Sequence, residues 1–242
     1  MMNGTYLRFE LLRTVRNRRL FVFSLGMPLL LYGLIALPNR HETLGGIPFA
    51  TYYMVGMMSW GATTAVLAGG GRIAVERTLG WSRQLRTTPL RPSVYLASKV
   101  AAGYVMALAS MVVLAGVGVA SGVELSAGAW TRMVGLTLVG LVPFATLGIA
   151  FGHVLHLDSL GPVLGGTTAV FAILGGVWGP VADSGWLHQV GLALPSYWLV
   201  QSGRVAVAGQ LWPARGWLVV GAWTAALAVL ASAAYRRDTK RA

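Results

Sequence analysis

The chain has 242 residues, of which 55% are hydrophobic and only 11% are charged, and it contains no cysteine. Soluble domains carry about 25% charged residues, so this composition excludes a soluble globular protein. The lack of cysteine excludes disulfides, thiol catalysis and thiolate metal sites. The formal net charge of +12 would suit a nucleic-acid partner, unless the basic residues follow a membrane pattern.

Apolar runs of about the 20 residues that span a bilayer recur along the chain. Because these runs are continuously apolar rather than alternating, they predict helices and not a membrane barrel. We therefore expect an all-α integral membrane protein with six transmembrane helices, forming one transmembrane domain over residues 1–242. The six predicted spans are 20–37, 50–71, 95–120, 131–151, 160–180 and 217–235.

The Lys and Arg residues are divided unequally between the two sets of loops. Of the 19, 15 lie before residue 20, between residues 72 and 99, or after residue 235, and the others are Arg40, Arg132, Arg204 and Arg215. The positive-inside rule places the richer segments, and both termini, in the cytoplasm. The basic excess is thus a topology signal, and we expect no nucleic-acid partner.

Residues 4–19 predict a helix that lies in the inner membrane interface, because Leu7, Leu11 and Val15 recur every four residues beside a basic face. A basic flank that only orients the first span is the alternative. The apolar run 20–37 is longer than a signal-peptide core and ends in no small-residue cleavage site, so we expect it to be retained.

The outer segment 181–216 is too apolar for a solvated loop, yet Pro195 and several glycines interrupt it. Irregular backbone at membrane depth needs protein or water partners, so we expect a re-entrant helical hairpin in the outer leaflet. The alternative is a surface helix anchored by Trp186, Trp198 and Trp212 at the level of the lipid head groups.

No energy-converting motif is present in the chain. The phrase Gly69-Gly70-Gly71-Arg72 lacks the Lys-Ser/Thr of a P-loop, and we interpret it as the flexible end of the second span. All seven Asp and Glu residues fall in or near predicted loops, whereas proton- and sodium-coupled carriers commonly keep buried carboxylates. We therefore expect the energy to come from another protein.

His153, His156 and Asp158 form H-x-x-H-x-D in a short inner loop. Imidazole and carboxylate groups could bind Zn²⁺ there, as an intramembrane lipid-modifying enzyme would require. No catalytic Glu accompanies the two histidines as it does in H-E-x-x-H. We interpret the three as polar loop residues, and expect neither a metal site nor enzymatic activity in this chain.

Glycines recur at four-residue spacing as Gly148/Gly152, Gly161/Gly165 and Gly175/Gly179. Such pairs permit close helix contact. We interpret them as packing within the chain rather than as a dimer face.

Residues 76–90 read E-R-T-L-G-W-S-R-Q-L-R-T-T-P-L and separate two apolar runs. A charged, helix-sized loop that ends at Pro89 suits the docking of a soluble partner. Glu76, Gly80, Leu85 and the Thr-Pro-Leu ending resemble the cytoplasmic signature of ATP-binding-cassette transporter permeases of the type-2 exporter class. Daunorubicin-resistance-type drug efflux permeases are similar in length and style.

A second match is Leu194-Pro195 with Tyr197 and Arg204, which is similar to the outer re-entrant region of that family. The resemblance implies a permease that binds no cofactor and pairs with a second permease subunit, identical or different. It also implies cytoplasmic P-loop ATPase subunits that hold ATP and Mg. The coupling residues would be Glu76, Arg77, Gly80, Trp81, Leu85, Arg86 and Pro89.

Such a permease would export a hydrophobic or amphiphilic substrate, such as a drug or a lipid-linked molecule, across a bacterial cell (inner) membrane. A secondary carrier and an intramembrane lipid-modifying enzyme are the alternatives. Tyr53, Met57 and Trp60 follow i, i+4, i+7 spacing, and with Phe171 we expect them to line the substrate pathway. Lipid contact or ordinary packing is the alternative for these four residues.

Overall fold

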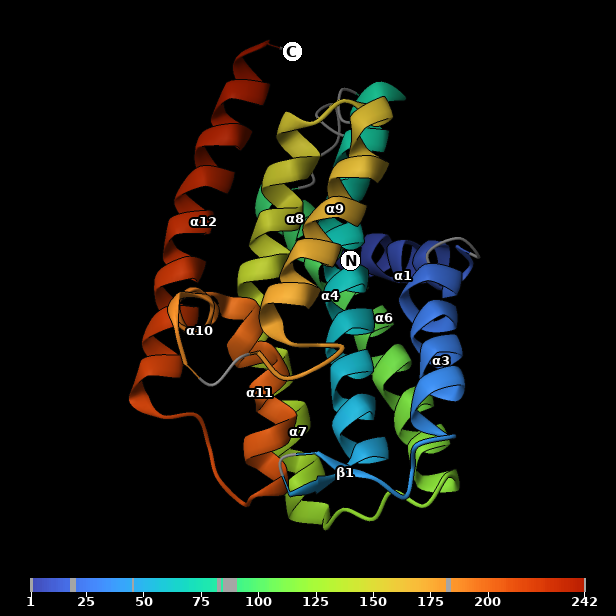
Figure 1. The fold of residues 1–242 in the computed structure, drawn as a ribbon. Helices are drawn as coiled ribbons and strands as arrows, with labels where there is room; N and C mark the ends of the chain where they lie inside the picture. The colour runs from blue at the N-terminus through green and yellow to red at the C-terminus, as the bar shows by residue number, and fades with distance from the viewer. Residues whose placement is uncertain are drawn as a thin grey trace.

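The structure is a computed structural model that describes residues 2–17, 21–44, 46–81, 84, 91–181 and 184–241. Its regular structure is helical, apart from strands β1 (Thr43–Leu44) and β2 (Ile47–Pro48), which pair antiparallel with Thr43 opposite Pro48. The long helices run side by side, and the β1–β2 hairpin lies at the end of the bundle opposite the C-terminus (Figure 1). This arrangement agrees with the predicted class, an all-α membrane protein.

The helices follow the predicted apolar runs closely. The first run does not form one regular α-helix. Two π-helical segments, η1 and η2, flank a short α-helix there. The helical elements are α1 (Met2–Val15), η1 (Val22–Gly26), α3 (Met27–Leu31), η2 (Tyr32–Ala36), α4 (Phe49–Thr78), α6 (Pro92–Ala120), α7 (Ala127–Gly140), α8 (Val142–Val154), α9 (Leu157–Gly175), α10 (Trp186–Leu192), α11 (Pro195–Val207) and α12 (Ala214–Arg241).

Four helical stretches of the described residues are long and apolar enough to cross a membrane. They are Pro92–Ala120, Ala127–Val154, Leu157–Gly175 and Ala214–Asp238, and they coincide with the third to sixth predicted spans. The first apolar helix, Ser24–Ala36, is shorter, and α4 is long but less apolar. The arrangement of six spans therefore remains a prediction.

Helix α4 is the central element of the fold, which explains its composition. It packs against α6, α8, α9 and α11, and most of its side chains are buried. Because neighbouring helices rather than lipid surround it, α4 can hold Ser, Thr and Tyr residues that a lipid-facing span would avoid. Contacts with neighbouring helices, rather than high hydropathy, thus explain why this segment is buried.

Glycines allow α8 to cross α4 at short range. A Cβ atom on Gly70 would lie 2.3 Å from the carbonyl carbon of Gly148, and one on Gly152 would lie 2.4 Å from the carbonyl oxygen of Gly70. Our interpretation of residues 69–71 as a flexible end was wrong, because they lie inside a buried helix at a backbone crossing. Packing within the chain is confirmed for Gly148 and Gly152, but the same interpretation was wrong for Gly161 and Gly165, where a Cβ would meet no atom within 4 Å.

The segment before the last helix folds into two short helices, α10 and α11, with α11 packed against α7 and α9. Trp198 and Trp212 are only 5% and 4% exposed, so they cannot anchor a surface helix among head groups, whereas Trp186 is exposed. The two short helices contact each other, and the re-entrant hairpin expected here remains a prediction, as does its depth in the outer leaflet.

The three residues singled out in this segment have structural contacts. Pro195 is the first residue of α11, and the Tyr197 ring lies 5.3 Å from that of Trp198. Arg204 donates through Nη2 to the carbonyl oxygen of Gly176 at 2.9 Å, and its guanidinium lies 4.0 Å from the centre of the Tyr52 ring. Arg204 thus ties α11 to the end of α9 and to α4.

The close crossing of α4 and α8 predicts a selective response to alanine. Gly70→Ala should lower the thermal stability of the purified chain, because overpacking a tight contact costs about 1–3 kcal/mol. Gly166→Ala is the matched control, since a Cβ there meets no atom within 4 Å. Equal melting temperatures for the two variants, measured by thermal unfolding in detergent, would contradict this account of the crossing.

Labelling of single cysteines can test the predicted orientation, because the native chain has none. Glu42 lies beside the β1–β2 hairpin and Leu79 follows α4, so these exposed residues mark opposite ends of the bundle. We expect a membrane-impermeant maleimide to label Glu42→Cys in intact cells and Leu79→Cys only after the cells are opened. Labelling of Leu79→Cys from outside intact cells would contradict the predicted topology.

Candidate functional site

A lysine buried between three helices forms the centre of a cluster of ionic contacts. The Lys99 side chain, on α6, is 0% exposed. Its Nζ atom lies 2.8 Å from Oε1 of Glu10 on α1 and 2.5 Å from Oε1 of Glu76 on α4. One ammonium group therefore joins the N-terminal helix to the facing ends of α4 and α6.

Further contacts extend this pair of salt bridges into an ion cluster, which comprises Glu10, Arg13, Arg72, Glu76 and Lys99. The Arg13 Nη1 atom lies 3.2 Å from Oε1 of Glu76, and the Arg72 Nη1 atom lies 3.7 Å from Oε1 of Glu10. Two uncharged side chains support the cluster. The Tyr95 hydroxyl donates to Oε2 of Glu76 at 2.7 Å, and Arg72 donates to the Thr14 hydroxyl.

The surroundings of the cluster on α1 are poorly solvated. Burial raises the pKa of the Tyr6 hydroxyl well above its usual range, and the nearby carboxylates of Glu76 and Glu10 raise it further. Both effects disfavour a negative charge on the phenol. Tyr6 therefore stays neutral and packs beside Tyr95, with the two ring centres 6.4 Å apart.

A second ionic link joins α12 to the same end of α4. Asp238 lies 2.9 Å from Nε of Arg77 through one oxygen and 2.9 Å from Nδ1 of His153 through the other. Arg77 also donates through Nη1 to the carbonyl oxygen of Gly152 at 3.1 Å. The C-terminal part of α12 is thereby fastened to α4 and α8.

The H-x-x-H-x-D motif is divided by these contacts. His153 is buried in the last turn of α8 and faces Asp238, whereas His156 and Asp158 lie at the start of α9. Within the described ranges, no group of three or more His, Cys, Asp or Glu side chains could hold a metal ion. The arrangement is that of a structural contact between helices.

The predicted coupling residues do not share one exposed face. Glu76 is 1% exposed inside the ion cluster, and Arg77 is paired with Asp238, so neither points freely toward a partner. Gly80 follows α4 with a φ of 72°, a left-handed conformation that glycine adopts without strain. Trp81 is 40% exposed. The remaining three, Leu85, Arg86 and Pro89, lie outside the described residues.

The most exposed apolar residue beside this loop was not among the predicted coupling residues. Leu79, directly after α4, is 71% exposed, although the segment around it is charged. Large apolar side chains that remain exposed can mark an interaction site. Together Leu79 and Trp81 form an apolar tip at the end of α4.

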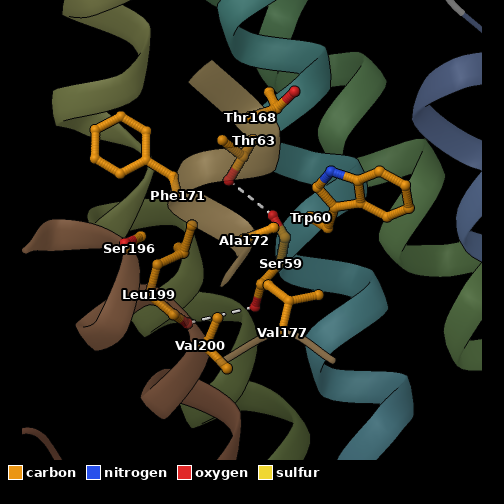
Figure 2. A pocket seen from close by; sticks show the side chains of 10 residues that line it. All are labelled: Ser59, Trp60, Thr63, Thr168, Phe171, Ala172, Val177, Ser196, Leu199 and Val200. Carbon is orange, nitrogen blue, oxygen red and sulfur yellow. Dashed lines mark hydrogen bonds between the residues drawn. The ribbon is translucent and has the colours of Figure 1, made fainter. Parts of the chain in front are cut away.

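The structure brings together two of the four residues predicted to line the pathway. Trp60 and Phe171 lie on opposite sides of a small cavity of about 10 Å³ between α4, α9 and α11 (Figure 2). Tyr53 and Met57 are 1% and 0% exposed in the hydrophobic core and line neither this cavity nor the groove described below. Their spacing placed them on one face of α4, but that face packs against protein.

A much larger groove of about 600 Å³ lies along the C-terminal half of α4. Residues of α4 and α9 form its walls, and Met27 of α3 contributes at one side. Its lining is apolar except for two threonines and one arginine. The lining residues are Met27, Trp60, Thr64, Leu67, Ala68, Gly71, Arg72, Val75, Leu160, Gly161, Leu164, Gly165, Thr168 and Ala169.

Other signals in the sequence could have revealed part of this site. Lys99 lies inside an apolar span, near its start, and an ionisable residue at such a position indicates a partner or a function. Its partner Glu10 is 89 residues away in the chain, so spacing could not have identified it. Arg72 was interpreted as the residue after a glycine run and as one of the basic residues that set the topology, and its position beside a groove needed the fold.

Comparisons with known proteins agree on one class. The family model described as "ABC-2 family transporter protein" matches residues 35–233. A Bacillus subtilis (strain 168) protein named "Putative transport permease YvfS" is 26% identical over 192 residues, which cover 78% of this chain and 78% of that protein. The match to the family model extends from the first apolar helix to α12.

The buried ammonium group predicts a large cost on removal. Lys99→Met should lower the stability of the purified chain by about 3–5 kcal/mol, because it leaves the buried carboxylates of Glu10 and Glu76 without their shared partner. Adding Glu10→Gln to Lys99→Met should recover part of that loss. The measurement is chemical unfolding of the wild type and both variants. A Lys99→Met chain as stable as the wild type would contradict the central role of this cluster.

Proposed function

We propose that this chain, which belongs to the ABC-2 transporter family, is the permease subunit of an ATP-driven exporter whose ATP is hydrolysed by a separate chain. Its family and the similar permease make it a membrane transport subunit, and its apolar helices make it a multi-pass membrane protein. The dependence on ATP, the direction of transport and a location in a bacterial inner membrane are parts of the proposal.

The observation that supports a separate ATPase most strongly is the apolar tip beside a charged loop. Leu79 and Trp81 remain exposed where α4 ends, next to the loop that resembles a coupling helix. Exposed apolar side chains of this kind are suited to a pocket on a protein partner. The chain lacks a P-loop of its own, so an ATPase partner that holds ATP and Mg would fit this position.

The ion cluster supports a mechanical role for Glu76 in place of the direct contact expected from the sequence. Glu76 lies in the last turn of α4 and Lys99 lies near the start of α6, so their salt bridge braces the two helices between which the loop lies. Glu10 extends the brace to α1. A push on the loop by a partner would therefore act on three helices together.

The groove along α4 supports a substrate pathway that is shared with a second permease subunit. Its walls come from α4 and α9, and its size is suited to an apolar or amphiphilic molecule. In this proposal the groove of one subunit forms one side of the pathway, and the second subunit, identical or different, forms the other side. Trp60 remains the leading contact among the residues predicted from sequence, because it lines both the groove and the small cavity.

The alternatives receive less support from the contacts. A lipid-modifying enzyme would need His153 beside His156 and Asp158, but His153 is directed to Asp238. A secondary carrier would need a carboxylate that binds and releases its coupling ion. Glu10 and Glu76 form salt bridges with Lys99, and Asp238 forms one with Arg77.

The apolar tip provides the test of the proposed function. The tagged chain is co-expressed with each cassette ATPase of the same genome, and the purified complex is assayed for ATP hydrolysis. We expect Leu79→Asp and Trp81→Glu to reduce the amount of bound ATPase about tenfold or more, since losing an apolar hot spot costs about 2 kcal/mol.

Leu211→Asp is the matched control, because Leu211 is also exposed but lies in the segment between α11 and α12. It should bind ATPase as the wild type does. If no cassette ATPase associates with the wild-type chain, or if Leu79→Asp and Trp81→Glu both retain full binding, the proposed docking at this tip is wrong.

A further inference from the structure

The groove between α4 and α9 has one charged end. Among the residues that line it, Arg72 is the single ionisable side chain. Trp60 lies at the other end, twelve residues earlier on the same helix. At 1.5 Å per residue, about 18 Å of helix separates the two.

This length is close to that of one membrane leaflet. The hydrocarbon core of a bilayer is about 30 Å thick, so one leaflet provides roughly 15 Å. A lipid-like molecule in the groove could therefore place its head group at Arg72 while its apolar body reaches Trp60. The walls along that length are Met27 and a set of Leu, Ala, Gly and Thr residues, which present no second charge.

The charge at the head of the groove is positive. Arg72 is partly accessible, with its side chain 13% exposed, and its contacts to Thr14 and Glu10 both use Nη1. The ion cluster around it contains three cations, Arg13, Arg72 and Lys99, but only two carboxylates. An anionic group at Arg72 would neutralise this surplus.

We propose that the groove binds a membrane amphiphile with one anionic head group, a phosphate or a carboxylate, whose head group contacts Arg72 and whose apolar body lies along α4 and α9. A guanidinium group can donate two parallel hydrogen bonds to either anion. A cationic head group would meet like charge at the same place. The inference rests on the proposed transport function and narrows its substrate class to anionic amphiphiles.

Photo-crosslinking to the purified full-length chain, in micelles of a neutral alkyl maltoside, tests this proposal without requiring transport. The probe is dodecyl phosphate with a diazirine in its chain. Unlabelled dodecyl phosphate, dodecanoate, dodecyltrimethylammonium and inorganic phosphate serve as competitors. We expect labelling of α4 and α9, and competition by the two anionic amphiphiles about tenfold stronger than by the ammonium compound, as for a charge-assisted hydrogen bond.

Two pairs of variants separate the head group from the groove. Arg72→Gln should abolish the preference for the anion, whereas Arg72→Lys should keep much of it. Gly165→Leu should block the groove, because a Cβ at Gly165 meets open space, and Gly166→Leu is its control because Gly166 also faces open space but does not line the groove.

Each outcome either supports or overturns the proposal. Equal competition by the phosphate and the ammonium amphiphile overturns it, as does full binding by Arg72→Gln or by Gly165→Leu. Competition by inorganic phosphate as strong as that by dodecyl phosphate would show a soluble anion as the ligand and also overturns it. Selective binding by a chain whose ATPase complex transports nothing would refute the proposed function and leave the site standing, so the two failures are distinguishable.

Discussion

The ammonium group of Lys99 holds together the end of the bundle at which three helices meet. Burying this charge costs several kcal/mol, and only well-placed carboxylates offset the cost. Glu10 and Glu76 supply them from different helices, so α1, α4 and α6 are held in one arrangement. Because a half-complete buried network is unfavourable, the three helices should keep these contacts as a set.

The faces and the two ends of helix α4 have different neighbours. Its glycines let α6 and α8 approach closely on one side, while the side toward α9 leaves room for the groove. Its start lies beside the β1–β2 hairpin and its end lies in the ion cluster. The helix that packs the core therefore also lines the open surface, so a movement of its end would change the shape of the groove.

Hydropathy and charge were sufficient to predict the class and most helix positions, because lipid requires the outer helices to be apolar. They were weaker for α4, whose burial depends on protein neighbours that a sequence does not display. Four-residue spacing grouped Tyr53 with Met57 correctly on one face but could not tell whether that face meets a cavity or the core. The partners of Glu76 were invisible for the same reason, since Glu10 and Lys99 come from distant parts of the chain.

The contrast between the glycines of α8 and those of α9 has a consequence for how such a protein can diversify. Gly148 and Gly152 meet backbone atoms, so any side chain there would disturb the scaffold, whereas Gly161 and Gly165 face open space. Single substitutions on α9 can thus reshape the groove while the helix crossings stay intact. A scaffold with this division could acquire new cargo preferences one residue at a time, without passing through unstable intermediates.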